Sequence, residues 1–145
     1  MPESVAAQLS HVDLFAGLPE DELREIASKS VVMVYPAGAK VAVQGGPTAG
    51  FHLILRGSAV VDVNGVERPG LGEGHYFGEM SLLDGEPPSA TIKAGPDGMR
   101  TSVLSQLAFY PILDSHPDMA RHIISVLARR LRASEAARHH DADEG

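Results

Sequence analysis

One stretch of the sequence carries residue types that could hold an anion. Residues 77–94 read FGEMSLLDGEPPSATIKA, in which Gly78-Glu79 opens the stretch and small residues close it. A loop that turns into a short helix presents free backbone N–H groups, and these suit an anion without any side chain. The stretch contains no arginine, and Pro87-Pro88 stands where such a loop would be expected to hold a cation.

Helical segments are predicted on both sides of this stretch. Residues 14–30 read LFAGLPEDELREIASKS, with Pro19 just inside the helix start and three acidic residues in its first turn. A shorter helix over residues 5–9 would complete a helical region over residues 1–30. A C-terminal helix is predicted over residues 115–135, followed by a polar, frayed tail over residues 136–145. The apolar residues at helical spacing there are Met119, Ile123, Val126, Leu127 and Leu131.

The middle of the chain alternates short apolar runs with turn sequences. The runs are VVMVY, KVAVQ, FHLILRG, AVVDV, ATIKA and TSVLSQLAFY, and they are separated by PAG, GGPTAG, NG, GLGEG and GPDG. Asn64-Gly65 is a hairpin signal, and no helix-length segment intervenes between the runs. The pattern predicts a mainly β fold: an antiparallel β-roll or jelly roll over residues 31–110, flanked by N-terminal and C-terminal helices. We expect a single domain over residues 1–145.

The net charge and the amino-acid composition argue against several classes of binding partner. The 145 residues have a formal net charge of −7, which repels polyanions, so we expect no nucleic-acid partner. There is no cysteine, which excludes disulfides, thiolate metal sites and cysteine nucleophiles. The N-terminus has no signal-peptide pattern, and no apolar stretch is long enough to span a membrane. We therefore expect a soluble, cytoplasmic protein with no membrane partner.

Neither catalysis nor a metal site is predicted. No serine lies in a nucleophile-elbow pattern, and GLGEG is not followed by the Lys-Ser or Lys-Thr of a phosphate loop. His52, His75 and Glu79 could converge as metal ligands, as in cupin-type rolls, but such sites start from a His-x-His pair that this chain lacks. His139-His140, with Asp141 and Asp143, is interpreted as part of a solvated tail. The protein is predicted not to be an enzyme.

Taken in order, these features resemble the cyclic nucleotide-binding domain family. The resemblance covers residues 9–132, and residues 77–94 resemble the family's phosphate-binding cassette without a gap. It implies that Glu79 accepts a hydrogen bond from a ribose 2′-hydroxyl and that amides near Met80 and Ser81 face the phosphate, with Gly78 supplying the tight backbone. The amides of Ser89 and Ala90 would face the phosphate as well. The segments that carry the resemblance are LFAGLPEDEL, YPAGAKVAVQG, FHLILRGSAVV with a glycine that ends its strand, GLGEGHYFGEMSLLDGEPPSATIKA and ARRLR.

One position of the cassette departs from the family. The family places a phosphate-binding arginine where this chain has Pro88, and proline supplies neither a guanidinium nor an N–H. A hydrogen bond to a charged group contributes roughly 1.5–3 kcal/mol, so binding should be weakened roughly 10–150-fold. Lys93, Arg100 or the Ser89 hydroxyl could compensate; if Ile92 packs in the core, Lys93 points outward and cannot.

Two functions follow from the resemblance. The first is a stand-alone cyclic nucleotide-binding regulatory module for cyclic AMP or cyclic GMP, without a cofactor, that signals through its C-terminal helix to an unknown effector protein. About 13 residues follow Arg132, too few for a second domain, and the helix could instead pair with a second copy as a homodimer. The alternative is a degenerate fold that no longer binds nucleotide and acts as a protein-interaction module.

Overall fold

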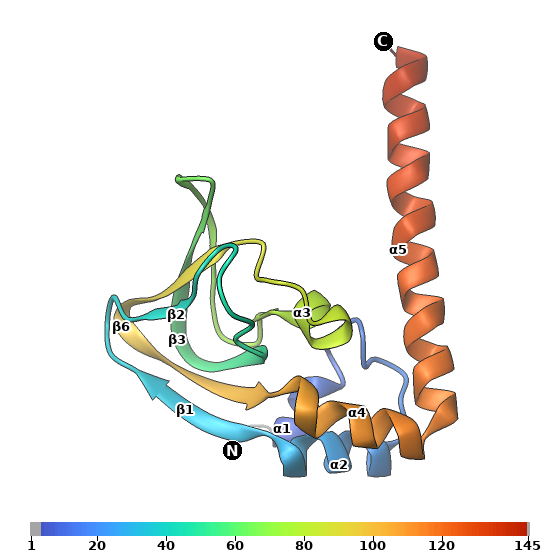
Figure 1. Cartoon of the computed structure of the whole chain (residues 1–145), viewed down its shortest axis with the longest axis horizontal. Coiled ribbons are helices and arrows are strands. Elements are labelled where there is room, and N and C mark those ends of the chain that lie inside the picture. The colour runs from blue at the N-terminus through green and yellow to red at the C-terminus, as the bar shows by residue number, and fades with distance from the viewer. Residues whose placement is uncertain (1–3, 145) are drawn as a thin grey trace.

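A β-roll packs on a group of helices that come from both ends of the chain, and the last helix extends beside the roll (Figure 1). The computed structural model describes the backbone of residues 4–144 and the side chains of residues 4–138. In chain order the elements are α1 (Val5–Leu9), α2 (Glu20–Lys29), β1 (Val31–Tyr35), β2 (Lys40–Ala42), β3 (Phe51–Val63), β4 (Val66–Leu71), β5 (Tyr76–Phe77), α3 (Glu79–Asp84), β6 (Thr91–Leu104), α4 (Gln106–Ser115) and α5 (Pro117–Glu144).

The strands form one antiparallel sheet. Its order is β1-β6-β3-β4, with β2 pairing to β6 and β5 to β3. The predicted Asn64-Gly65 turn joins β3 to β4, and both residues have positive φ angles, 54° and 81°. The mainly β antiparallel roll with flanking helices is therefore confirmed.

The roll has a core on each face of its long strands. Because successive side chains of a strand point to opposite faces, Leu53 packs outward against the helices while Ile54 packs inside the roll. Phe15, from the segment between α1 and α2, lies edge-on to Phe51 and Phe109, with ring centroids 5.6 Å and 5.9 Å apart. The helices thus close one face of the sheet, and the roll encloses the other.

Two predicted strand boundaries are wrong. Gly57 was expected to end a strand and GPDG to form a turn, yet β3 and β6 run through both places. Gly57 has a φ of +82°, and a Cβ there would lie 2.2 Å from the carbonyl oxygen of Gly98. The register of the β3–β6 pair shifts on both sides of this close approach. These glycines therefore mark bulges at which the paired strands bend, and not strand ends.

The segment after β6 also differs from the prediction. Residues 105–110 were expected in the roll, but β6 ends at Leu104 and the Ser105 side chain caps α4 by accepting the Ala108 N–H at 3.1 Å. Helix α4 buries Phe109 and Ile112 against the outer core. The tail predicted from residue 136 is helical too, since α5 continues to Glu144. Within residues 4–144, no helix combines the length and apolarity needed to cross a membrane.

His116 lies at the junction between α4 and α5 and connects this junction to α2. Its Nε2 lies 2.6 Å from a carboxylate oxygen of Glu25, and its Nδ1 lies 3.3 Å from one of Glu22. The hydrogen bond to Glu25 raises the pKa of His116, with further contributions from the charges of Glu25, Glu22 and Asp21. The second Glu22 carboxylate oxygen is buried and has no hydrogen-bond partner among the described residues. Protonated His116 is thus held between two carboxylates of α2.

We expect this contact to stabilise the fold in a pH-dependent way. Because the pKa of His116 is raised in the folded state, its stabilisation is fully present below the unfolded pKa of about 6.5 and is lost as pH rises through the folded value. The melting temperature of the wild type should therefore exceed that of His116→Gln most at pH 5.5 and least at pH 8.5. A Glu25→Gln variant should show a smaller pH dependence than the wild type. If the difference in melting temperature between the wild type and His116→Gln stayed constant from pH 5.5 to pH 8.5, the pH-dependent contribution of the His116–Glu25 contact would be ruled out.

Candidate functional site

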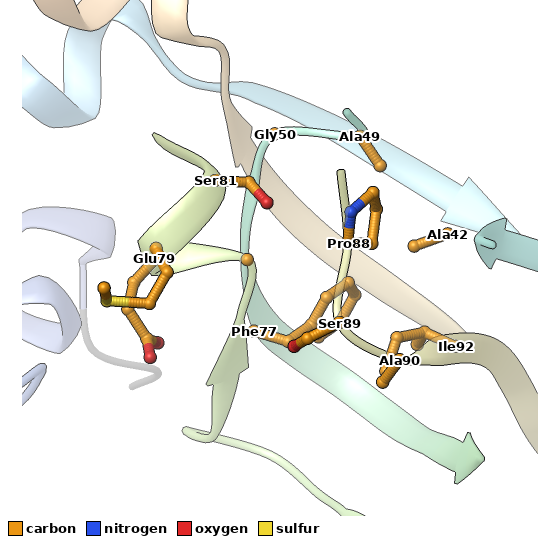
Figure 2. A pocket seen from close by; sticks show the side chains of 12 residues that line it. Ala42, Ala49, Gly50, Phe77, Glu79, Ser81, Pro88, Ser89, Ala90 and Ile92 are labelled. Carbon is orange, nitrogen blue, oxygen red and sulfur yellow. The ribbon is translucent and has the colours of Figure 1, made fainter. Parts of the chain in front are cut away.

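The predicted site residues surround one cavity (Figure 2). It has a volume of about 110 Å³ and lies between α3, the segment before β6 and the segments that flank β3 and β2. All seven predicted residues line it: Gly78, Glu79, Met80, Ser81, Pro88, Ser89 and Ala90. Five further lining residues were not predicted: Ala42, Ala49, Gly50, Phe77 and Ile92.

Gly78 permits the sharp entry into α3 at the cavity wall. It has a φ of +84° and occupies the N-cap position of α3, so the helix begins at the next residue, Glu79. A Cβ at Gly78 would lie 2.2 Å from the carbonyl oxygen of Gly50. Both the backbone angle and the close approach require glycine here. The loop before β3 and the start of α3 are consequently held against each other.

Glu79 lines the cavity, but its carboxylate faces α5. Figure 2 shows the side chain directed away from Pro88 and Ser89. Its Oε1 lies 3.8 Å from Nη1 of Arg130, while Nε of Arg130 donates to Asp13 at 3.0 Å. Burial raises the pKa of Glu79, and the Arg130 charge acts in the opposite direction. Arg130 therefore joins the cassette, through Glu79, to α5 and to the segment after α1.

Serine hydroxyls line both walls of the cavity, Ser81 on α3 and Ser89 on the segment opposite α3. In Figure 2 the Ser81 hydroxyl points toward Pro88, across the cavity from α3. The carbonyl oxygen of Pro88 accepts the Gly45 N–H at 3.0 Å, which fixes this wall to the loop after β2. The cavity can thus offer hydroxyl and backbone donors to an anion from two sides.

None of the residues that line the cavity is a lysine or arginine, as far as the structure describes the chain. Ile92 is 4% exposed inside the roll, and Lys93 is accordingly directed outward. Arg100 lies on a different hollow, together with Arg56. Of the three groups expected to compensate for the missing arginine, only Ser89 lines the cavity.

The histidines considered as metal ligands have other partners. Nδ1 of His52 lies 3.0 Å from the Thr101 hydroxyl and Nε2 lies 2.9 Å from the Ala49 carbonyl, while the ring stacks on Phe77. Nδ1 of His75 accepts the Gly72 N–H. Over the part of the chain that the structure describes, no three His, Cys, Asp or Glu side chains are placed to hold a metal ion. His139-His140 and the aspartates near them lie outside the described side chains.

Sequence comparison identifies the domain. A family profile described as the cyclic nucleotide-binding domain matches residues 32–116, which include all of the roll except its first residue, and every residue that lines the cavity. The chain belongs to the cyclic nucleotide-binding domain family. The resemblance carried by the cassette is thereby confirmed, and so is its implication for the fold.

Relatives of this cyclic nucleotide-binding domain occur in proteins of different kinds. The cAMP-dependent protein kinase regulatory subunit of Aspergillus niger is 35% identical over 117 residues, which cover 79% of this chain and 28% of that protein. The Thermus thermophilus catabolite activator protein superimposes with a TM-score of 0.69 at 29% identity, covering 90% of this chain and 63% of that structure. The N-terminal domain of a Streptomyces coelicolor transcriptional regulator shares the fold, with a TM-score of 0.80 at 24% identity, covering 90% and 96%. The chain thus spans only about a quarter of the curated kinase subunit.

Two parts of the site could not be found from the cassette alone. Ala49 and Gly50 belong to a glycine-rich segment that predicted a turn, but nothing local shows that this turn forms a cavity wall. Arg130 belongs to the ARRLR segment, which carried the resemblance without assigning any residue a role. Its contact with Glu79 spans about 50 residues of sequence, so only the folded chain reveals it.

Proposed function

We propose that this domain binds cyclic AMP or cyclic GMP in the cavity around α3 and responds through α5. The observation that supports this most strongly is the convergence of all seven cassette residues on one cavity in a cyclic nucleotide-binding domain. Backbone and serine donors on both walls would hold the phosphate, and Glu79 at the rim would accept the ribose 2′-hydroxyl. No lining group has a catalytic role in this proposal, and we place the protein in the cytoplasm.

The response would reach a partner through the exposed face of α5. Ile124 and Leu131 lie seven residues apart on this helix and are 64% and 57% exposed. Apolar side chains at that spacing fall on one side of a helix and favour pairing with a second helix. That helix would belong to an effector protein or to a second copy of this chain.

A second function is favoured by one observation. Pro88 lines the cavity where a phosphate-binding arginine was expected. Neither Lys93 nor Arg100 lines the cavity, so neither supplies the missing positive charge. A cavity that has lost its nucleotide would leave the roll and helices as a protein-interaction module. Nucleotide titration separates the two functions.

We expect calorimetric titration of the wild type with cyclic AMP or cyclic GMP to give a dissociation constant in the micromolar range. Glu79→Gln removes the charged acceptor and should weaken binding roughly 10–150-fold. Glu73→Gln is the matched control, because Glu73 is exposed and does not line the cavity. If the folded wild type binds neither nucleotide, the interaction module is the correct function. Equal losses in the two variants would show that Glu79 does not contact the ligand.

A further inference from the structure

Strand β1 presents an unusually apolar free edge. It pairs only with β6 among the described strands, and it lies on the side of the roll away from α5 (Figure 1). Val31, Val32, Met33 and Val34 are 59%, 45%, 43% and 72% exposed. The strand contains no charged residue and no proline, which are the usual protections of an edge against pairing with another chain. Its outer N–H and C=O groups are therefore open to an added segment.

Two arginines lie beside this edge on one face of the sheet. Arg56 on β3 and Arg100 on β6 are direct cross-strand neighbours, and Val34 on β1 is the neighbour of Arg100 on its other side. Residues directly opposite in an antiparallel pair project from the same face. A row from Val34 through Arg100 to Arg56 consequently crosses three strands, with both guanidinium groups exposed.

The two arginines lack a counterion. Within residues 4–138 neither guanidinium makes an ion pair or hydrogen bond, although like charges directly opposite in a sheet repel each other. Both line a hollow of about 480 Å³, which Val34 also borders and which no helix of the described chain lines. Asp97 borders the same hollow but is not paired with either arginine. Two guanidinium groups without a counterion thus lie beside the apolar strand β1.

We propose that β1 and the Arg56–Arg100 pair form a docking surface for an extended acidic segment of a partner protein. The main chain of the segment would pair with the free edge of β1, and its apolar side chains would pack on the exposed valines. Its carboxylates would reach the hollow, where guanidinium groups bind carboxylates through paired hydrogen bonds. A segment added to β1 lies about 10 Å from β6 and farther from β3, so Arg100 contributes more than Arg56.

Charge complementarity supports an acidic occupant over a basic or neutral one. The chain carries a net charge of −7, so an acidic segment is repelled over most of the surface and attracted at this uncompensated pair. The surface is separate from the nucleotide cavity, since the two share no lining residue. The proposal therefore does not depend on nucleotide binding.

The test uses the full chain and a fluorescein-labelled peptide with four Val-Glu repeats. Fluorescence anisotropy at low salt should show binding, and a peptide with four Val-Gln repeats should bind at least tenfold more weakly. The Arg56→Gln/Arg100→Gln double variant should lose roughly tenfold in affinity for the Val-Glu peptide, and Arg100→Gln alone should account for most of that loss. Val34→Asp should also weaken binding, because its carboxylate would pair with Arg100 and repel the peptide.

The matched control is the Arg68→Gln/Lys93→Gln double variant, which removes two exposed cations that do not line the hollow. It should bind the Val-Glu peptide within about twofold of the wild type, and circular dichroism should show that all variants stay folded. No binding of the Val-Glu peptide by the wild type would overturn the proposal. Equal binding of the two peptides, or equal losses in the two double variants, would overturn it as well.

Discussion

Pro88→Arg is expected to raise the affinity for cyclic AMP by roughly 10–150-fold. The arginine would supply a guanidinium and a backbone N–H at a position that lines the cavity and now offers neither. The hydrogen bond that fixes this wall uses the carbonyl of residue 88, which accepts the Gly45 N–H, so the substitution leaves it intact. Calorimetric titration of both proteins under identical buffer conditions measures the gain.

Pro87→Arg is the matched control for this gain. It adds the same charge and removes a proline one position earlier, at an exposed residue that does not line the cavity. If Pro87→Arg raised the affinity as much, the effect would be a general change in charge and not a contact with the phosphate. An unchanged affinity in Pro88→Arg would mean that the phosphate is bound elsewhere or not at all.

Gly78→Ala is expected to lower the free energy of unfolding by about 2–5 kcal/mol and to abolish nucleotide binding. Part of the loss is the cost of a left-handed backbone for a residue with a Cβ. The rest arises because that Cβ would lie 2.2 Å from the Gly50 carbonyl oxygen, which forces the α3 entry and the loop before β3 apart. Urea unfolding followed by circular dichroism measures the loss.

Gly74→Ala separates the two causes. Gly74 has nearly the same φ, +82°, but a Cβ there would meet nothing within 4 Å. It should therefore lose only the conformational part, about 1–2 kcal/mol. Equal losses at Gly74 and Gly78 would contradict a tight contact between α3 and the loop at Gly50.

The sequence predicted the roll well because its signals are local. Alternating apolar runs, the Asn64-Gly65 turn and the acidic first turn of α2 each determine a few neighbouring residues, and the structure contains all three, with Pro19 just before the helix rather than just inside it. The continuity of β3 through Gly57 and of β6 through residues 95–98 was not predicted, because a glycine between apolar runs signals a turn or a bulge equally well. The choice depends on the close approach of Gly57 to Gly98, which lies about 40 residues away.

Helix α4 was missed for a different reason. Its apolar residues follow a strand directly, and Pro111 opposes a helix in any local interpretation. The proline is tolerated because the carbonyl it leaves without a partner belongs to Leu107, a residue that is 90% exposed. Solvent can therefore satisfy that carbonyl, and the burial of Phe109 and Ile112 then favours the helix.

The cassette is one continuous segment, which explains why all seven of its predicted residues meet at the cavity. The remaining wall and the α5 contact come from segments that are distant in the sequence, namely Ala42, the loop at Ala49 and Gly50, and Arg130. No local pattern specifies which remote residues face a site. These parts of the site can be identified only from the folded structure.

If the domain binds a nucleotide as proposed, the contact of Arg130 with Glu79 and Asp13 would make ligand affinity and the position of α5 two measures of one equilibrium. A ligand hydroxyl bound by the Glu79 carboxylate would compete with Arg130 and would weaken the contact that holds α5, and the size of this effect is the coupling free energy. By thermodynamic reciprocity, a partner that draws α5 away must change the ligand's affinity by the same factor. The binding constant of a small molecule would then report, without any label, how firmly a protein partner holds the far end of the helix.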